Sequence, residues 1–376
     1  MKKSLILFLL LASCVLCLVP PVFAEDKYIR VAVIQDSQYL RLAVNGIYRI
    51  IDSGSGKILS RGKNLKSTVV SSKEGILLAG KNYRADKILI EADDPESISL
   101  NNRKFRGNVQ IIKKSNLHLL AVNFINLEDY VKGILYNEIS HYWPQEAIKA
   151  QAVVSRTFAI YLIQQNRNKD YDATNDIYSQ VYGGRASERS RTNKAVDDTK
   201  GEVIFYQKKI FPAFFHATCA GRTEDVSELW NIDVPPLKGV VCGFCQESPH
   251  FHWHYVMTTK QIEEAMVKNG YKNCRQIEDI QILERDPSGR IRYLKIILPQ
   301  ETIKISAKDF RSIIGPNLIR STNFKVEIAE KDAVFEGLGW GHGVGMCQWG
   351  AYFMAKSGKD YRQIIQYYFP GTQIRP

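Results

Sequence analysis

Residues 127–163 read LEDYVKGILYNEISHYWPQEAIKAQAVVSRTFAIYLI, and this stretch predicts two consecutive α-helices. In its first half, apolar side chains recur at helical spacing, at Leu127, Tyr130, Val131, Ile134 and Leu135. Trp143-Pro144 interrupts the pattern, and Pro144 suits the first turn of a second helix. That second helix is rich in Ala and apolar around most of its circumference, which indicates that it is buried.

Glu138 follows Ile134 by four positions and Val131 by seven, so it lies on the apolar face of the first helix. Burial of a carboxyl group there would raise its pKa and keep it protonated, as a general acid requires. Arg156 on the second helix is also costly to bury without a partner. A buried acid near a buried cation indicates a functional site. The pattern equally allows Glu138 to end its helix in solvent, with Arg156 as its surface partner.

The remaining sequence predicts an α+β fold. Residues 28–122 contain short apolar runs separated by turns rich in Gly, Asn, Asp and Ser, which predicts a β-rich region. Asn45-Gly46 is a strong hairpin signal within it. Further on, polar capping residues, among them Thr258 or Thr259 and then Ser306, predict short helices, and strand-like runs lie between them. These helices are expected at residues 258–268, 306–314, 346–356 and 360–369.

The N-terminus indicates export. Met1-Lys2-Lys3 precedes an apolar run and the small-residue site Val22-Phe23-Ala24, which predicts a signal peptide over residues 1–24. Leu11-Ala12-Ser13-Cys14 leaves open a lipoprotein, and membrane association is expected only if Cys14 is lipidated. The formal charge of +12, or +10 without Lys2 and Lys3, favours an anionic partner such as peptidoglycan. No nucleic-acid motif is present, so a nucleic-acid partner is not expected.

Four residues have the spacing of a metal site. His216-x-x-Cys219 and Cys242-x-x-Cys245 are two chelating pairs separated by 22 residues. One His and three Cys form a closed ligand set, which favours structural zinc over catalytic zinc. Three alternatives remain: a disulfide between Cys219 and Cys242 that leaves Cys245 unpaired, a disulfide between Cys242 and Cys245, or replacement of His216 as ligand by one of the nearby histidines. These are His250, His252 and His254.

A Gly-rich run over residues 337–345 predicts a loop that presents His342. Its glycines allow a saccharide or another protein segment to approach the backbone closely. The alternative is a tight loop that carries His342 by coincidence.

Two groups of motifs together resemble the stage II sporulation protein D (SpoIID/LytB, amidase-enhancer) family. The first is Asn137-Glu138-Ile139, Trp143-Pro144-Gln145-Glu146-Ala147, Lys149-Ala150-Gln151-Ala152-Val153 and Arg156-Thr157, and the second is Gly339 to Met346 with Gln348-Trp349-Gly350-Ala351. The family usually has Ser where Cys347 stands. The resemblance implies that Glu138 is the catalytic acid of a cleft. It also implies that substrate-binding residues line this cleft, namely Arg156, Gln180, Tyr182, His342 and Gln348.

The first functional hypothesis is a lytic transglycosylase that cleaves peptidoglycan glycan strands already stripped of stem peptides. Ordinary glycosidases use two carboxylates. A lytic transglycosylase can use one, because the muramic acid 6-hydroxyl is the nucleophile. The alternative is a non-catalytic, glycan-binding enhancer of an N-acetylmuramoyl-L-alanine amidase. A cysteine hydrolase built from Cys347 and His342 is disfavoured, because no third orienting residue is evident.

The expected organisation has three parts. A signal peptide over residues 1–24 precedes a β-rich region over 25–125. A mixed α/β core over 126–376 then contains the substrate cleft and the zinc site. The expected location is the periplasm or cell envelope, in wall remodelling during division or sporulation. The partners are glycan strands and a cell-wall amidase.

Overall fold

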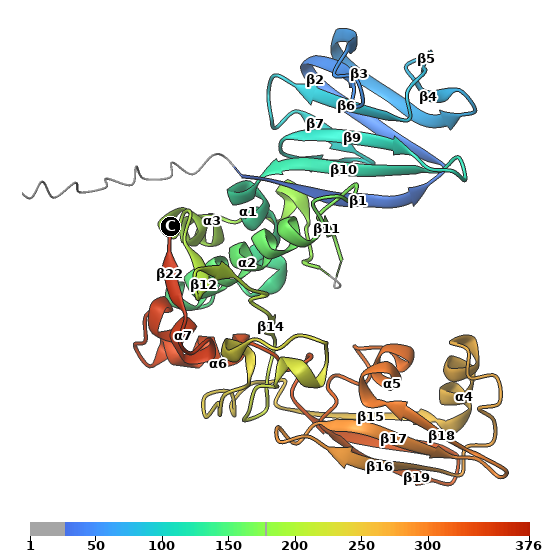
Figure 1. The fold of residues 1–376 in the computed structure, drawn as a ribbon, viewed down its shortest axis with the longest axis vertical. Helices are drawn as coiled ribbons and strands as arrows, with labels where there is room; N and C mark the ends of the chain where they lie inside the picture. The colour runs from blue at the N-terminus through green and yellow to red at the C-terminus, as the bar shows by residue number, and fades with distance from the viewer. Residues whose placement is uncertain (1–26, 177–178) are drawn as a thin grey trace, which may run out of the picture.

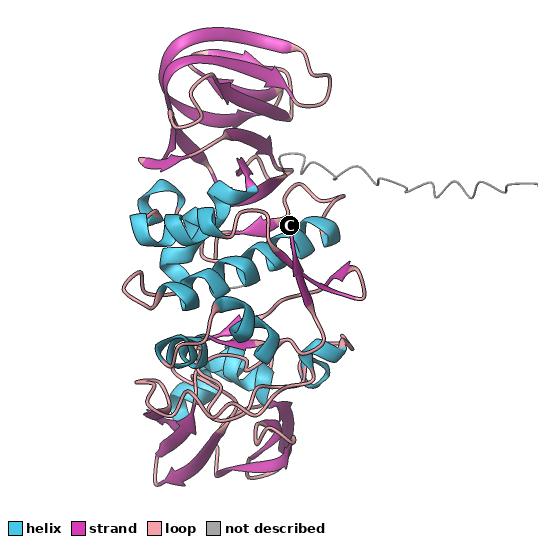
Figure 2. Cartoon of the chain, turned by 90° about the vertical axis from the view of Figure 1, so that its left-hand side faces the viewer, coloured by secondary structure: helices cyan, strands magenta, loops and turns pink. Residues whose placement is uncertain are grey.

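The computed structural model describes residues 27–176 and 179–376. The expected signal peptide and Cys14 lie outside the described residues. Helices gather in the middle of an elongated molecule, with a β-rich region at each end (Figures 1 and 2). The α+β prediction is confirmed.

The N-terminal region is one large sheet. Its strands run in the order β11-β1-β10-β9-β6-β2-β3-β4-β5, with β7 paired to β2 and β8. The first ten strands are β1 Tyr28–Ser37, β2 Tyr39–Asp52, β3 Ile58–Ser72, β4 Gly75–Leu78, β5 Lys81–Tyr83, β6 Lys87–Ala92, β7 Ile98–Leu100, β8 Arg103–Phe105, β9 Asn108–Lys113 and β10 Leu119–Asn126. A short strand from beyond the first helices, β11 Ala173–Thr174, pairs in parallel with β1.

The predicted hairpin at Asn45-Gly46 is wrong. Strand β2 continues through both residues, and its register against β3 shifts between Val44 and Ile47. Such a shift is a β-bulge, and Gly46 supplies the positive φ of 118° at this position. The chain reverses instead between Asp52 and Ile58, where Gly56 N–H donates to the Asp52 carbonyl at 2.8 Å.

The two predicted central helices are present. Helix α1 covers Leu127–Glu138 and begins at Asn126, whose side chain accepts the Glu128 N–H. Helix α2 covers Gln145–Gln165 and is buried over most of its length, as its Ala-rich sequence predicts. The elements around this pair are η1 Gly184–Ser187, α3 Ser190–Asp198, β12 Val203–Tyr206, β13 Lys209–Ile210, α6 Gln348–Lys356, α7 Tyr361–Tyr368 and β22 Gln373–Arg375.

The C-terminal β-rich region holds two small antiparallel sheets, β15-β20-β19 and β16-β17-β18. Their strands are β15 His252–Thr258, β16 Asp279–Arg285, β17 Ile291–Ile297, β18 Thr302–Ser306, β19 Phe324–Ala329 and β20 Asp332–Leu338. Helices α4 (Thr259–Lys268) and α5 (Ala307–Ile314) pack with these sheets in one hydrophobic cluster. Both helices start where the capping residues predict, at Thr258 and Ser306.

Two short strands connect the middle of the molecule to this end. Strand β14 (Phe215–His216) pairs in parallel with β21 (Met346–Cys347), directly before α6. The 3₁₀ turns η2 (Val226–Glu228) and η3 (Pro235–Leu237) follow β14. This junction therefore brings the second half of the chain back against α2.

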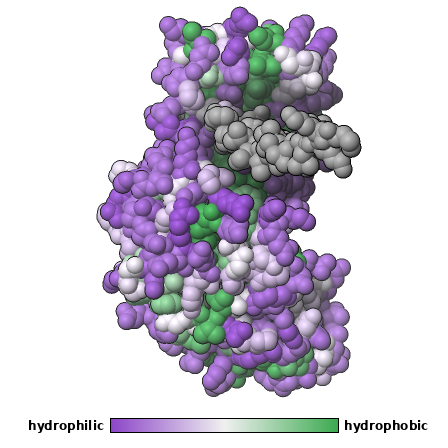
Figure 3. Space-filling view, turned by 60° about the vertical axis from the view of Figure 1, so that its left-hand side comes forward, coloured by the Kyte–Doolittle hydropathy of each residue, from purple (hydrophilic) through white to green (hydrophobic). Residues whose placement is uncertain are grey.

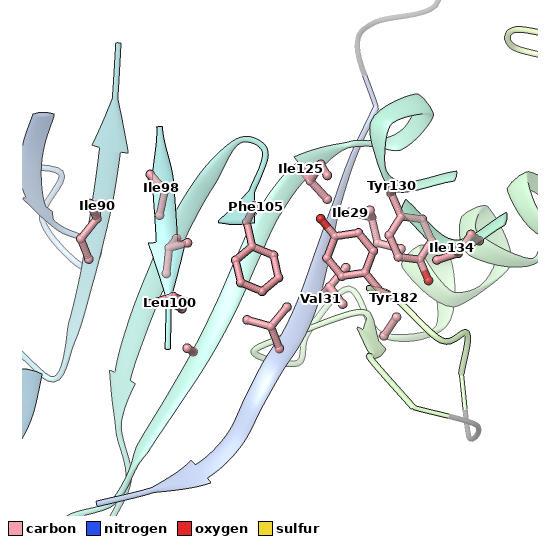
Figure 4. Packing of buried hydrophobic residues seen from close by; sticks show 14 of the residues in the cluster. Ile29, Val31, Ile90, Ile98, Leu100, Phe105, Ile125, Tyr130, Ile134 and Tyr182 are labelled. Carbon is pink, nitrogen blue, oxygen red and sulfur yellow. The ribbon is translucent and has the colours of Figure 1, made fainter. Parts of the chain in front are cut away.

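The expected boundary near residue 125 coincides with the change from β10 to α1. The sheet nevertheless shares a hydrophobic cluster with α1 and α2, which includes Ile29, Phe105, Tyr130 and Ile134 (Figure 4). The division into separate domains therefore stays a prediction. Within the described residues, no helix combines the length and the apolar character needed to cross a bilayer. The face in Figure 3 is largely hydrophilic, with separate small hydrophobic patches.

Candidate functional site

A cleft of about 570 Å³ opens where α1, the loop after β11, strand β14 and the His342 loop meet. Four of the residues predicted for the site line it, namely Glu138, Gln180, His342 and Gln348. They come from segments far apart in the sequence. The Gln348 side chain, for example, donates to the Glu138 carbonyl 210 residues away. The fold thus assembles the cleft from both halves of the chain.

Glu138 is the last residue of α1, and its carboxyl group faces the cleft. Burial raises its pKa to about 7, against the opposing effect of the Val181 N–H, which donates to Oε1 at 3.1 Å. Asn137 donates to the Val181 carbonyl at 2.8 Å and so fixes this loop beside the helix end. A carboxyl group in this environment holds its proton at near-neutral pH and can act as a general acid.

Arg156 does not reach the cleft. Its guanidinium is fully buried and forms two hydrogen bonds to the Glu128 carboxylate, at 2.7 and 2.9 Å. It also donates to the carbonyl groups of Val196 and Glu202. The alternative in which Arg156 is the surface partner of Glu138 is therefore wrong. Arg156 instead ties α2 to the first turn of α1.

The side chains of Gln180 and Tyr182, on the same loop, point in different directions. Gln180 lines the cleft, and its amide is held by the Tyr130 hydroxyl at 3.1 Å and the Ser155 carbonyl at 3.3 Å. Tyr182 points away from the cleft into the core, where its ring lies between Phe105 and Tyr130 (Figure 4). Its hydroxyl donates to Asn123 at 2.9 Å. Tyr182 therefore anchors the loop, and the structure does not place it among substrate contacts.

His342 forms the opposite wall. Its ring stands edge-on to Phe214 and Trp230, and its Nδ1 accepts the Val344 N–H at 3.1 Å. Burial lowers the pKa of His342 to about 3, with further lowering from Arg311 and Arg290. The imidazole is therefore neutral at pH 7, which suits a hydrogen-bonding role better than an electrostatic one.

Gln348 begins α6 and closes the cleft beside Glu138. Its Nε2 donates to the Glu138 carbonyl and to Gln151 Oε1, both at 3.2 Å. Gln151 in turn donates to Ser155 at 3.0 Å. This chain of amides holds the end of α1, the middle of α2 and the start of α6 in one arrangement.

Several residues that line the cleft were not predicted from the sequence. Lys308 and Arg311 reach the cleft from α5, and Trp230 and Trp340 supply aromatic rings. The two cations lie on a short helix whose pattern predicts only an amphipathic element, so no local signal marks them as site residues. Among the described lining residues, Glu138 is the single carboxylate. The cleft thus combines one acid with a basic and aromatic wall.

The predicted ligand set needs a correction. The sulfurs of Cys219, Cys242, Cys245 and Cys347 all lie within 4.8 Å of one another. His216 is not among them; its ring lines the cleft, and its Nδ1–H donates to the Val344 carbonyl at 3.0 Å. The disulfide between Cys219 and Cys242 is also absent. The four cysteines form a group with the geometry to hold a metal ion, and Cys347 takes the place assigned to His216.

Comparison with known proteins agrees with this architecture. The family described as stage II sporulation protein matches residues 115–206, which include Glu138 and Gln180. Stage II sporulation protein D of Bacillus subtilis is 30% identical over 271 residues, which cover 68% of this chain and 76% of that protein. The chain belongs to the stage II sporulation protein D family.

Further matches cover different lengths of the chain. An uncharacterized protein of Brachyspira hyodysenteriae is 33% identical over 94% of both chains. The amidase enhancer of Bacillus subtilis is 28% identical over 65% of this chain, but the match spans only 40% of that protein. Residues 237–345 match a separate domain of unknown function, DUF8618, which contributes the His342 wall of the cleft.

A larger hollow of about 830 Å³ in this stage II sporulation protein D family member lies on the β15-β20-β19 sheet. Strand residues such as His252, His254 and Glu336 line it. Its lining includes none of the residues of the two family motifs. Size alone therefore does not identify the site, and the cleft at Glu138 is the candidate that contains the motif residues.

Proposed function

We propose that this protein cleaves peptidoglycan glycan strands as a lytic transglycosylase, in remodelling of the cell wall. One observation carries the proposal: Glu138 is the single carboxylate among the described residues lining the cleft, and burial raises its pKa to about 7. An ordinary glycosidase needs a second carboxylate as nucleophile or base. A lytic transglycosylase does not, because its nucleophile belongs to the substrate.

The reaction needs only one proton carrier. Protonated Glu138 donates its proton to the glycosidic oxygen as the bond from muramic acid C1 to that oxygen breaks. The resulting carboxylate then accepts the proton of the muramic acid 6-hydroxyl, whose oxygen bonds to C1. The products are a free 4-hydroxyl on the leaving sugar and a 1,6-anhydro-muramic acid end. Glu138 regains its proton, and no water is consumed.

The remaining cleft residues suit a glycan. Gln180, His342 and Gln348 offer neutral hydrogen-bonding groups for hydroxyl and acetamido groups. Lys308 and Arg311 offer positive charge to the lactyl carboxylate of a muramic acid that has lost its stem peptide. Arg156 and Tyr182 are not part of this proposal, because both are engaged inside the protein.

The test is digestion of purified glycan strands that lack stem peptides, with products identified by mass. Wild type should release fragments ending in 1,6-anhydro-muramic acid, and Glu138→Gln should release none. Glu301→Gln, an exposed Glu between β17 and β18, is the matched control and should cleave normally. Reducing-end products in place of anhydro ends would overturn the transglycosylase mechanism.

A second candidate is a non-catalytic enhancer of a cell-wall amidase, and the relative named amidase enhancer favours it. This reading needs glycan or amidase binding but no acid. It predicts that Glu138→Gln and wild type stimulate a purified N-acetylmuramoyl-L-alanine amidase equally. Anhydro products from wild type alone, without any amidase, would exclude this candidate as the sole function.

The setting and the cofactor complete the proposal. The basic chain acts outside the cytoplasm, in the periplasm or cell envelope, where its net charge of +10 without Lys2 and Lys3 favours anionic wall polymers. The cysteine cluster holds one structural zinc ion that does not contact the substrate. The process served is division or sporulation.

A further inference from the structure

Four buried sulfurs meet at the junction between the two halves of the protein. Cys219 lies just after β14, Cys242 and Cys245 lie on the following loop, and Cys347 immediately precedes α6. All four side chains are at most 1% exposed. In a tetrahedral zinc site the bond length of about 2.3 Å places the sulfurs about 3.8 Å apart. The observed separations, 3.5 Å for Cys219 and Cys245 and at most 4.8 Å overall, match this geometry.

Hydrogen-bond donors converge on the sulfurs. Cys347 Sγ accepts the backbone N–H of Cys219 and of Gly350, both at 3.3 Å. The Gly350 N–H belongs to the first turn of α6, a helix terminus that favours negative charge on sulfur. The Tyr368 hydroxyl lies 3.2 Å from Cys242 Sγ. Donors placed around a ligand atom are typical of a metal centre, where they orient the ligands and stabilise thiolate.

A disulfide does not explain the cluster as well as a metal does. Bonded sulfurs lie about 2.05 Å apart, and one disulfide would leave two of these four thiols without a role. Four thiolates also make a closed set with no open coordination position, which is typical of structural zinc. His216, the competing ligand, is not in the group of ligand atoms that lie within 4.8 Å of one another.

The cluster is joined directly to the cleft. Gln348 follows Cys347 in sequence and donates to the Glu138 carbonyl at 3.2 Å. Cys347 pairs with His216 across β14 and β21, and His216 lines the cleft. A metal bound to Cys347 would therefore fix the start of α6. It would also fix the Gln348 side-chain amide beside Glu138.

We propose that Cys219, Cys242, Cys245 and Cys347 bind one zinc ion through four thiolates, and that this site holds Gln348 and the His342 loop against Glu138. Metal binding does not depend on the proposed reaction. Only the importance of the site for catalysis rests on the proposed function. Cys219, Cys242 and Cys245 would position the cleft wall that contains His216, and Cys347 would connect that wall to α6.

The first experiment measures metal per chain in the purified full chain by mass spectrometry. Wild type should contain about one zinc per chain, and Cys347→Ser should lose most of it. Cys274→Ser is the matched control, because Cys274 is buried in the C-terminal hydrophobic cluster away from the four sulfurs, and it should retain zinc. His216→Gln should also retain zinc. Loss of zinc in His216→Gln with retention in Cys347→Ser would overturn the ligand set.

A second measurement does not depend on a variant that folds. Wild type loaded with cobalt(II) in place of zinc should show the intense visible bands of a tetrahedral site and the near-ultraviolet charge transfer of four thiolates. Wild type that binds no metal, or whose cysteines are found as disulfides by mass mapping, would overturn the proposal. Iron in place of zinc in the protein as purified would overturn the choice of metal.

The positioning effect has its own readout. Removal of metal by a chelator should increase amide hydrogen exchange in residues 341–350, while exchange in the β1–β10 sheet stays unchanged. This readout needs no catalysis, so it remains informative if the transglycosylase proposal fails. Unchanged exchange over 341–350 in chelated, metal-free protein would show that the site does not hold the cleft.

Discussion

Glu138 and Glu224 are two carboxyl groups whose pKa burial raises to about 7, yet their surroundings differ. Glu138 lines an open cleft and accepts one backbone N–H. Glu224 is 1% exposed and is enclosed by partners. It accepts hydrogen bonds from Ser288 Oγ and the Asp225 N–H, both at 2.8 Å, and lies 3.9 Å from Arg290. Only Glu138 can therefore meet a substrate.

The comparison teaches that a raised pKa does not by itself identify a catalytic acid. Glu224 and Arg290 instead support the cleft from behind. The Glu224 N–H donates to the Gly343 carbonyl at 2.8 Å. The Arg290 guanidinium lies against Gly343, where a Cβ would come within 2.5 Å of it. Access to the cleft and a smaller number of hydrogen-bond partners distinguish Glu138, the proposed catalytic acid, from Glu224.

The largest expected difference between the two acids is in catalysis. Glu138→Gln should lower the rate of glycan cleavage by about 10²–10⁴-fold or more, because the amide cannot donate a proton to the glycosidic oxygen. Glu224→Gln should retain most activity per folded molecule at a temperature well below its melting point. The measurement is release of anhydro ends over time. Equal losses in both variants would contradict the assignment of distinct roles.

The next effect is on the pH dependence of stability. The folded chain holds the Glu138 proton up to about pH 7, whereas the unfolded chain releases it near 4.5. The folded state therefore binds more protons between these values, and its free energy of unfolding falls as pH rises through them, by roughly 3 kcal/mol.

Glu138→Gln should lack this fall, so the stability difference between variant and wild type should grow in favour of the variant from pH 4.5 to 7. Urea unfolding at several pH values measures it. Subtraction cancels the opposite contribution of His342, whose pKa is lowered to about 3. A difference that does not change with pH would mean that Glu138 has an ordinary pKa.

A smaller effect is expected from Glu224→Gln on stability. The amide can still accept from Ser288, but it carries one N–H more than a protonated carboxyl group and must bury that donor. We expect a loss of about 2 kcal/mol in the free energy of unfolding at pH 5, where the carboxyl group of Glu224 is protonated. Urea unfolding at pH 5 measures this loss, and Glu301→Gln, which changes an exposed Glu, should show almost none. A stabilised Glu224→Gln variant would show that this acid is not a support.

The smallest effect is expected at the back of the cleft loop. Tyr182→Phe removes the hydrogen bond to Asn123 and keeps the ring packing, so the free energy of unfolding should fall by about 1 kcal/mol. Glycan binding by the Glu138→Gln protein should not change when Tyr182→Phe is added. Loss of glycan binding in the double variant, measured by co-sedimentation with insoluble strands, would return Tyr182 to the substrate contacts.

The sequence predicts best what depends on neighbours in the chain. The caps at Thr258 and Ser306 are found where predicted, because each side chain accepts an N–H only three residues away. Helical spacing allowed Glu138 to face either the core or solvent, and the structure places it at the end of α1 with its carboxyl group in the cleft. The Asn45-Gly46 hairpin failed because the long pairing of β2 with β3 outweighs a local turn preference and absorbs both residues in a bulge.

The predictions that failed for site residues concern contacts between segments distant in sequence. Short spacing suggested His216 as the fourth ligand, whereas Cys347 reaches the cluster from 128 residues beyond Cys219. Arg156 faces Glu128 and not Glu138, and this choice depends on how α1 lies against α2, which periodicity does not specify. The Lys308 and Arg311 wall depends in the same way on where α5 packs.

The parallel pairing of β14 with β21 has a consequence for how the protein becomes active. A cleft closed by contacts such as Gln348 to Glu138, 210 residues apart, carries a large loop-closure cost and forms late in folding. The acid at the end of α1 can fold early, with the N-terminal sheet, but its opposite wall arrives only when α6 docks. A chain that folds stepwise from its N-terminus therefore passes through a stage in which Glu138 is present and its cleft is incomplete. On the proposed function, late assembly would confine glycan cleavage to the fully folded chain.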